Sequence, residues 1–237
     1  MEFTIDLHLV RQLIADERAR ADVEIREGGP IAALASSQRR HDDRLAAAAD
    51  ANTLACRAGC SWCCNFTIDV RAVEVFRILE YLATLPVTEQ QRLRERIERN
   101  AERLTGMDEE ERARINIECA FLRNGQCTIY AVRPQTCRNY HATDASGCKQ
   151  AFEQPENEDI DPDFAPYVYQ IGHAHVEAFA KALADARFDT DVYELNAALN
   201  AALNEPTTRS RFLSKVQPFT DLGGMEVQAE FLDEDEE

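Results

Sequence analysis

Four cysteines crowd into one short stretch of the chain with the spacing C-x3-C-x2-C-C: Cys56, Cys60, Cys63 and Cys64. A short irregular loop with this spacing can direct several thiolates toward one metal ion or one iron–sulfur cluster. Gly59 favours this geometry, because the backbone must bend sharply where ligands converge. The stretch therefore predicts an irregular, cysteine-rich metal-binding centre around which the rest of the chain is built.

A second group brings the total to eight cysteines: Cys119, Cys127, Cys137 and Cys148. Two of them flank a predicted hairpin and two lie on the residues that follow it. The first group contains a crowded adjacent pair, and the second has long gaps between its members. We therefore predict that the two groups share a metal site, with all eight cysteines as candidate ligands.

Disulfides are the main alternative to metal binding. Residues 1–10 have no basic segment followed by a long apolar run, so we expect no signal peptide and a cytoplasmic location. Thiols stay reduced in the cytoplasm, and a bond between the adjacent Cys63 and Cys64 would close a strained ring. These arguments favour a metal or cluster over disulfides and over inert buried thiols.

Net charge and hydropathy narrow the choice of partners. The chain has 237 residues and a formal net charge of −17. A surface this acidic repels phosphate backbones and anionic lipids, so we expect neither nucleic-acid nor membrane binding. No apolar run approaches the length of a membrane span. The partner is then an unknown protein or small molecule.

The periodicity of apolar residues predicts a mainly α fold with a small β-hairpin. Asn124-Gly125 between apolar runs is a strong hairpin signal, placing strands at 120–122 and 126–129. Asp69 is predicted to cap the third helix, and Pro134 to open a short turn within a loop over 130–148. The predicted helices span residues 6–20, 31–51, 70–85, 88–104, 108–116, 166–187 and 191–203.

We predict that residues 1–237 form a single domain in three parts. Residues 1–51 form N-terminal helices, 52–150 the cysteine core, and 151–237 the C-terminal helices with an acidic tail. The charge run at 233–237 is expected to be disordered. His175 lies on an apolar helix stripe, where it is more simply a core histidine than a metal ligand.

Four residues near Cys137 are candidates for the surroundings of the centre. Arg133 and Arg138 bracket this cysteine and could offset the negative charge of a thiolate-bound metal or cluster. Tyr140 could shield the centre from water, and His141 could be a ligand or a proton carrier. Ordinary surface arginines, a core tyrosine and a loop histidine are the simpler interpretations.

The pattern resembles a known family at the residues Cys119-Ala-Phe-Leu, Gly125-Gln-Cys127-Thr-Ile-Tyr130 and Arg133-Pro-Gln-Thr-Cys137-Arg138, preceded by the Cys63-Cys64 pair. These segments are similar to the YkgJ-type cysteine cluster proteins, also called the CxxCxxCC zinc- or iron-chelating domain. The first gap here holds three residues instead of two, and Ala120 replaces the usual proline. The resemblance implies metal binding and leaves the metal open. A lysine methylase acting on flagellin carries a similar motif, so the resemblance also allows an enzymatic role.

Cys56, Cys60, Trp62 and Cys63 also resemble the radical S-adenosylmethionine motif, in which three thiolates hold a [4Fe–4S] cluster. That motif normally opens a βα barrel, and no barrel strands are predicted here. The leading interpretation is therefore a protein with a [4Fe–4S] cluster in a redox or cluster-dependent role. A structural zinc module and an S-adenosylmethionine-using protein-modifying enzyme are the alternatives. Eight cysteines could form two four-cysteine sites, or one cluster with spare thiols.

Overall fold

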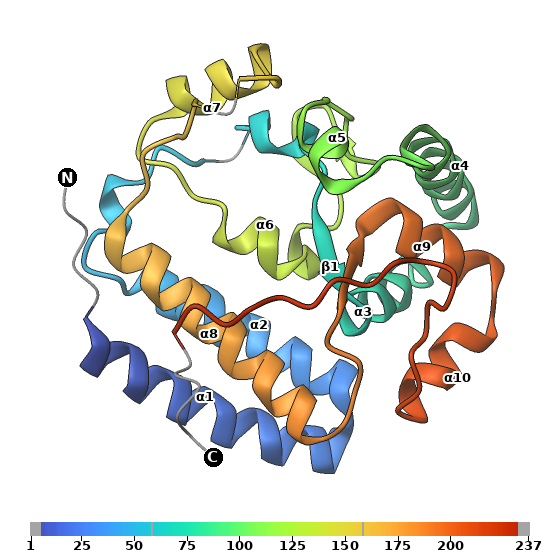
Figure 1. Ribbon diagram of the computed structural model, residues 1–237, viewed down its shortest axis with the longest axis horizontal. Coiled ribbons are helices and arrows are strands. Elements are labelled where there is room, and N and C mark those ends of the chain that lie inside the picture. The colour runs from blue at the N-terminus through green and yellow to red at the C-terminus, as the bar shows by residue number, and fades with distance from the viewer. Residues whose placement is uncertain (1–5, 58, 158, 232–237) are drawn as a thin grey trace.

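The computed structural model describes residues 6–57, 59–157 and 159–231, and it is mostly helical (Figure 1). Three long helices pack together at one side: α1 (Leu7–Gly28), α2 (Pro30–Ala46) and α8 (Pro166–Asp185). The first predicted helix thus continues well beyond residue 20. It ends at Gly29, whose φ of 81° suits glycine, and Pro30 opens the next helix.

A buried polar network crosses this three-helix unit. Glu17 is fully buried and accepts hydrogen bonds from Arg40 at 2.7 Å and Arg44 at 2.7 Å. His175 is also fully buried and lies 2.9 Å from the hydroxyl of Ser37. Its burial and bonding confirm the prediction of a core histidine, because buried polar groups need partners.

Four more helices surround the larger apolar core: α3 (Ala72–Leu82), α4 (Val87–Leu104), α9 (Leu195–Asn204) and α10 (Thr207–Leu213). Phe76 of α3 packs against Phe212 of α10, with ring centroids 5.3 Å apart. Leu93 and Ile97 of α4 are fully buried in the same core. The helix predicted at 88–104 is confirmed as α4, and the one predicted at 70–85 is present as the shorter α3, with Pro86 between the two.

Two small antiparallel sheets complete the described residues, and no parallel strand pair occurs among them. β1 (Asp69–Arg71) pairs with β4 (Val192–Glu194). Asp69 is therefore a strand residue, and the predicted helix cap at this position is wrong: Arg71 precedes the first turn of α3. The last predicted helix also begins later, because residues 192–194 form β4.

β2 (Leu122–Arg123) and β3 (Gln126–Cys127) form the predicted hairpin, in shorter form. Asn124 and Gly125 have φ values of 52° and 72°, the positive values that such a tight turn requires. The acidic run at 108–116 forms α5 (Glu109–Ala113), capped by Asp108.

Short helices carry the cysteine region: η1 (Ala51–Thr53), η2 (Trp62–Asn65), η3 (Tyr130–Val132), α6 (Gln135–Asn139) and α7 (Ala145–Glu153). The prediction of a loop over 130–148 with one turn at Pro134 is thus only partly right. The tail at 233–237 lies outside the described residues. Among the helices that are described, none has the length and apolar character needed to cross a bilayer.

Candidate metal centre

The first cysteine group lies on an irregular stretch that ends in η2. Gly59 has a φ of 89°, in the left-handed region, and the amide of Cys60 closes a turn onto the carbonyl of Arg57 at 2.9 Å. Cys63 and Cys64 then lie on the single turn of η2. The bend that Gly59 permits thus lies between Cys56 and Cys60.

Backbone hydrogen bonds connect this turn to the hairpin. The amide of Cys119 donates to the carbonyl of Cys64 at 2.8 Å, and the amide of Ile117 donates to the carbonyl of Asn65 at 2.8 Å. The hairpin follows directly, because the amide of Leu122 bonds the carbonyl of Cys119 and Leu122 pairs with Cys127. Three cysteines from distant parts of the sequence are thereby held in one small region.

Cys137 on α6 adds a fourth thiol to this region. Burial raises its pKa well above the ordinary value, and Cys119, Cys127 and Cys64 raise it further, because neighbouring thiolates repel one another. Burial also raises the pKa of Cys119 to about 12, with further contributions from Cys127 and Cys64. We call these four residues the hairpin set: Cys64, Cys119, Cys127 and Cys137.

Three of the four remaining cysteines lie near one another, beside η2. Helix α7, which carries Cys148, packs on η2, where the rings of Trp62 and Phe152 lie 5.3 Å apart. Burial raises the pKa of Cys148 to about 11, and Cys56 and Cys60 raise it as well. We call these three residues the loop set: Cys56, Cys60 and Cys148.

Cys56 is held in place by the residues that follow α6. The amide of Ala142 donates to the Cys56 sulfur at 3.4 Å, and the amide of Ala55 donates to the carbonyl of Ala142 at 2.8 Å. The segment between α6 and α7 thus forms one wall of the loop set.

Cys63 lies between the two sets. Its thiol donates a hydrogen bond to Cys64, which raises the pKa of Cys63 and lowers that of Cys64. Cys137 on one side and Cys56 on the other also raise the pKa of Cys63. The adjacent pair therefore spans the boundary between the sets.

All eight cysteines are free thiols. Within the described residues, no three His, Cys, Asp or Glu side chains converge closely enough to ligate one metal ion as they stand. A change of rotamer moves a cysteine sulfur by about 3 Å. The donor chemistry therefore fits a thiolate-bound metal, with adjustment of the side chains on binding.

Arg133 faces the hairpin set. Burial raises the pKa of Cys127 and of Cys137, and the positive charge of Arg133 acts in the opposite direction on both thiols. Its guanidinium lies 4.2 Å from the ring centre of Tyr130, and its Nε has no hydrogen-bond partner among the described residues. A buried donor without a partner is costly, so this N–H is available to an acceptor at the centre.

Arg138 has a different environment. Its side chain is 2% exposed and donates to the carbonyls of Arg133 at 3.0 Å and Ala131 at 2.9 Å, and to Asp42 of α2. Its charge is thus shared with backbone acceptors and a carboxylate. Arg138 shapes the segment before Cys137 more than it faces the thiols.

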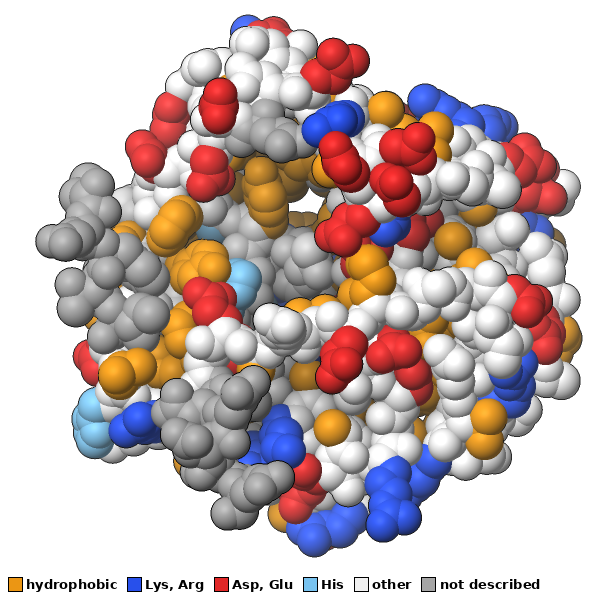
Figure 2. Space-filling view, viewed as in Figure 1, with side chains coloured by type: hydrophobic (Ala, Val, Ile, Leu, Met, Phe, Trp, Pro, Cys, Tyr) orange, Lys and Arg blue, Asp and Glu red, His pale blue; other side chains and the backbone are white. Residues whose placement is uncertain are grey.

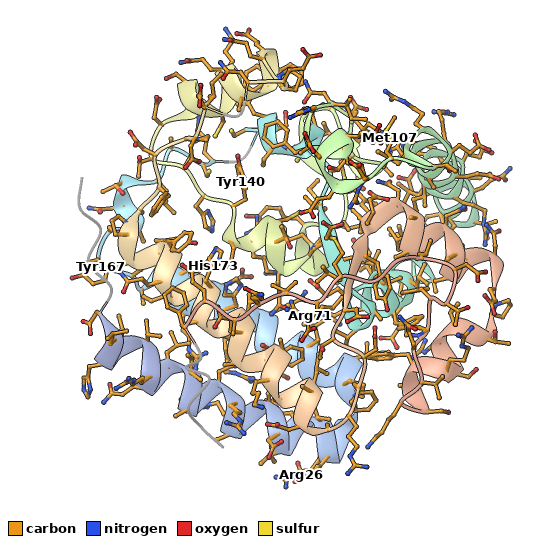
Figure 3. The ribbon with its side chains drawn as sticks, viewed as in Figure 1. Arg26, Arg71, Met107, Tyr140, Tyr167 and His173 are labelled. Carbon is orange, nitrogen blue, oxygen red and sulfur yellow. The ribbon has the colours of Figure 1, made fainter. Side chains whose placement is uncertain are left out.

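Tyr140 lies near the loop set, whereas His141 lies near Arg133 and Asp42. Tyr140, on the segment between α6 and α7 (Figure 3), has its pKa raised to about 12 by burial and by Cys148, Cys63, Asp161 and Cys56. Both ring nitrogens of His141 are buried and make no hydrogen bond within the described residues, and burial lowers its pKa.

Two residues of α2 that the sequence did not single out also support the centre. Asp42 pairs with Arg138, and the side-chain amide of Gln38 donates to the carbonyl of Arg133 at 3.3 Å. Gln38 in turn accepts a hydrogen bond from Arg77 at 3.0 Å. No local sequence signal could reveal these contacts, since they join segments far apart in the chain.

Comparison with known protein families supports metal binding by this region. Residues 55–161 match the family described as "CxxCxxCC: Putative zinc- or iron-chelating domain". No curated protein and no solved structure matches the chain. The matched range contains all eight cysteines, the hairpin and both short helices that carry Cys137 and Cys148. Residues 55–161 of the chain are therefore similar to the CxxCxxCC zinc- or iron-chelating domain.

Proposed function

We propose that the chain binds metal at two adjacent four-thiolate sites. The hairpin set forms one, and Cys63 completes the loop set to form the other. In this arrangement the adjacent Cys63 and Cys64 serve different sites, which avoids the awkward geometry of two neighbouring residues reaching one metal. A reducing compartment such as the cytoplasm suits this assignment, since it keeps eight thiols free.

We further propose that the hairpin set holds an iron–sulfur cluster, most simply [4Fe–4S], in a redox or cluster-dependent role. The observation that carries this proposal is the position of Arg133: a cation beside the thiols with an Nε–H that lacks an acceptor. Charge and hydrogen bonds to sulfur tune the potential of such clusters. When bound, the cluster would supply electron transfer or a reactive iron. The role of Arg133 would be to offset the negative charge and to donate to sulfur.

Structural zinc is the second candidate. It is favoured by the count of thiols, because each site would offer the four sulfurs that a closed Zn(Cys)4 centre needs. In that case the chain would be an interaction module, and the metal would order the segments between the cysteines.

Anaerobic purification after iron-replete expression tests the metal. A brown protein with stoichiometric iron and sulfide, and a spin signal after dithionite reduction, supports the cluster. Colourless protein loaded with zinc under these conditions supports the structural module. A spin signal that changes when S-adenosylmethionine is added would instead favour a modifying enzyme.

Cys63→Ser and Cys64→Ser are matched variants that test the assignment of sites. We expect each to lose the metal of one site only, with Cys137→Ser behaving like Cys64→Ser and Cys148→Ser like Cys63→Ser. If Cys137→Ser and Cys148→Ser change the same site, as judged by metal content and spectrum, the division into two sites is wrong.

A further inference from the structure

Helix α4 carries a stripe of arginines that stands out on an acidic protein. Arg92, Arg96, Arg99 and Arg103 recur at the spacing of one helix face, whereas Glu95, Glu98 and Glu102 fall on the neighbouring stripe. Figure 2 shows basic side chains gathered over α4, and others along the lower edge of the view. The formal net charge of the whole chain is −17, so this gathering runs against its overall charge.

Two of the four arginines already have partners. Arg92 pairs with Glu89 at 2.6 Å, and Arg96 pairs with Glu118 at 2.7 Å. Arg96 also donates to the carbonyls of Cys119 at 3.0 Å and Leu122 at 3.1 Å. This half of the stripe anchors the start of the hairpin.

The other two arginines make no ion pair with any described residue. Sequence spacing suggests a pair between Glu95 and Arg99, but Glu95 instead accepts a hydrogen bond from Gln91 at 3.2 Å. Arg103 is likewise exposed and unpaired within the described part of the chain. Two guanidinium groups one helical turn apart are thus free to bind an external anion.

These groups line a pocket of about 290 Å³, bounded by Arg96, Arg99, Asn100, Arg103 and Glu118. Three guanidinium groups face a single carboxylate there, and that carboxylate is bound to Arg96. Asn100, which also lines the pocket, is buried and donates to the carbonyl of Glu118 at 2.9 Å, so it joins α4 to the segment before the hairpin. The pocket is therefore small and lined by more positive than negative side chains.

We propose that this pocket binds a compact phosphate-type anion, either inorganic phosphate or the phosphoryl group of a small molecule. Planar guanidinium groups bind phosphate oxygens in bidentate fashion, and two of them can share one such group. The volume lies at the lower end of the range for small-molecule sites, which fits one phosphoryl group with a small attachment. The pocket borders the hairpin set, because Arg96 donates to the carbonyl of Cys119. The proposal does not depend on which metal the hairpin set binds.

Calorimetric titration of the full-length protein as purified, at constant ionic strength, tests the site. Inorganic phosphate and ribose 5-phosphate are the two probes, and the tighter binder identifies the source of the phosphoryl group. In Arg99→Gln/Arg103→Gln, we expect the dissociation constant to rise about tenfold or more, because the charged donors are lost. The control Arg26→Gln/Arg187→Gln changes the net charge equally at distant exposed sites and should bind within about twofold of the original chain.

Nuclear magnetic resonance gives a second measurement that needs no variant. Addition of phosphate should shift the Nε–H resonances of Arg99 and Arg103, while that of Arg26 stays in place. The proposal fails if neither probe binds at millimolar concentration, if the control variant loses as much affinity as the pocket variant, or if the three resonances shift equally.

Discussion

The amide of Cys119 donates a hydrogen bond to the carbonyl of Cys64 at 2.8 Å, joining the first cysteine of one group to the last cysteine of the other. A second backbone hydrogen bond, from the amide of Ile117 to the carbonyl of Asn65, joins the same two segments. The backbone of Cys64 is thus aligned with the start of the hairpin. Its neighbour Cys63 lies between Cys137 of the hairpin set and Cys56 of the loop set. The two cysteine groups of the sequence are therefore interleaved in space.

Removal of the metal should loosen this region selectively. Thiolate–metal bonds would order residues 119–148, whose helices are short, whereas α1 and α8 are held by their own apolar core. Hydrogen exchange before and after chelation should show protection at 119–148 falling at least about tenfold, with α1 and α8 unchanged. Equal protection at 119–148 in both states would contradict the prediction.

Replacement of Arg138 should lower the free energy of unfolding more than replacement of its partner Asp42. Arg138 is 2% exposed, and its loss in Arg138→Ala leaves the carbonyl of Ala131 without a donor and the carboxylate of Asp42 without its partner, so we expect a cost of about 3 kcal/mol. The side chain of Asp42 is 49% exposed, so Asp42→Asn should cost only about 1 kcal/mol. Urea unfolding measures both.

Asp43→Asn is the control for this pair, because Asp43 is exposed and makes no ion pair among the described residues. Its unfolding free energy should equal that of the original chain. If Asp43→Asn loses as much unfolding free energy as Asp42→Asn, the loss comes from the change in net charge and not from the contact with Arg138.

Replacement of Arg133 should alter the potential of a bound cluster. A reduced cluster carries more negative charge, so the removal of a nearby cation in Arg133→Gln should lower the midpoint potential by about 60 mV, a tenfold change for one electron. Arg133→Lys keeps the positive charge but lacks the Nε donor. Its midpoint potential should therefore lie between those of the original chain and Arg133→Gln. Potentiometric titration followed by electron paramagnetic resonance checks this, with Arg26→Gln as a control that leaves the potential unchanged.

Asp189 should make the fold less stable as the pH rises. Burial raises the pKa of this carboxyl from its ordinary value of 3.8 to about 6, and the charge of Asp191 raises it as well. Between these values the folded chain holds a proton that the unfolded chain has released, so stability falls from about pH 4 to pH 6. Asp189→Asn should remove this dependence.

At pH 7, Asp189→Asn should raise the free energy of unfolding by about 1 kcal/mol. The gain is this small because the carboxyl of Asp189 is partly solvated, and water screens the cost of burying its charge. Urea unfolding at pH 4 and pH 7 measures it, and the two proteins should differ least at pH 4. A variant that is no more stable than the original chain at pH 7 would refute the assignment of the penalty to this carboxyl.

Local signals in the sequence predict much of the fold. The apolar spacing of Val73 and Phe76 predicts α3, and Asn124-Gly125 predicts the hairpin, because each depends on residues close in sequence. The pairing of β1 with β4 is missed. Each strand has only three residues, and their register depends on packing between distant segments.

In the candidate site, too, the features with a local sequence signal are predicted and those that depend on distant contacts are not. Its donors are evident from the sequence, because the spacing of the cysteines is local. Which thiols lie together is not evident: Cys148 lies with Cys56 and Cys60 because α7 packs on η2, far from its neighbours in sequence. The contact of Asp42 with Arg138 has no local signal either.

The pairing of β1 with β4 bears on how this protein could be divided. Asp69 and Arg71 lie inside the range 55–161, whereas their partners Glu194 and Val192 lie beyond it. A fragment cut at the borders of the matched range would leave the edge of β1 unpaired. It would also lose the contact between Asp42 of α2 and Arg138. We propose that residues 1–237 fold as one unit. A minimal soluble fragment should then be designed around the interwoven strands, with both flanking regions retained, instead of around the borders of the matched range.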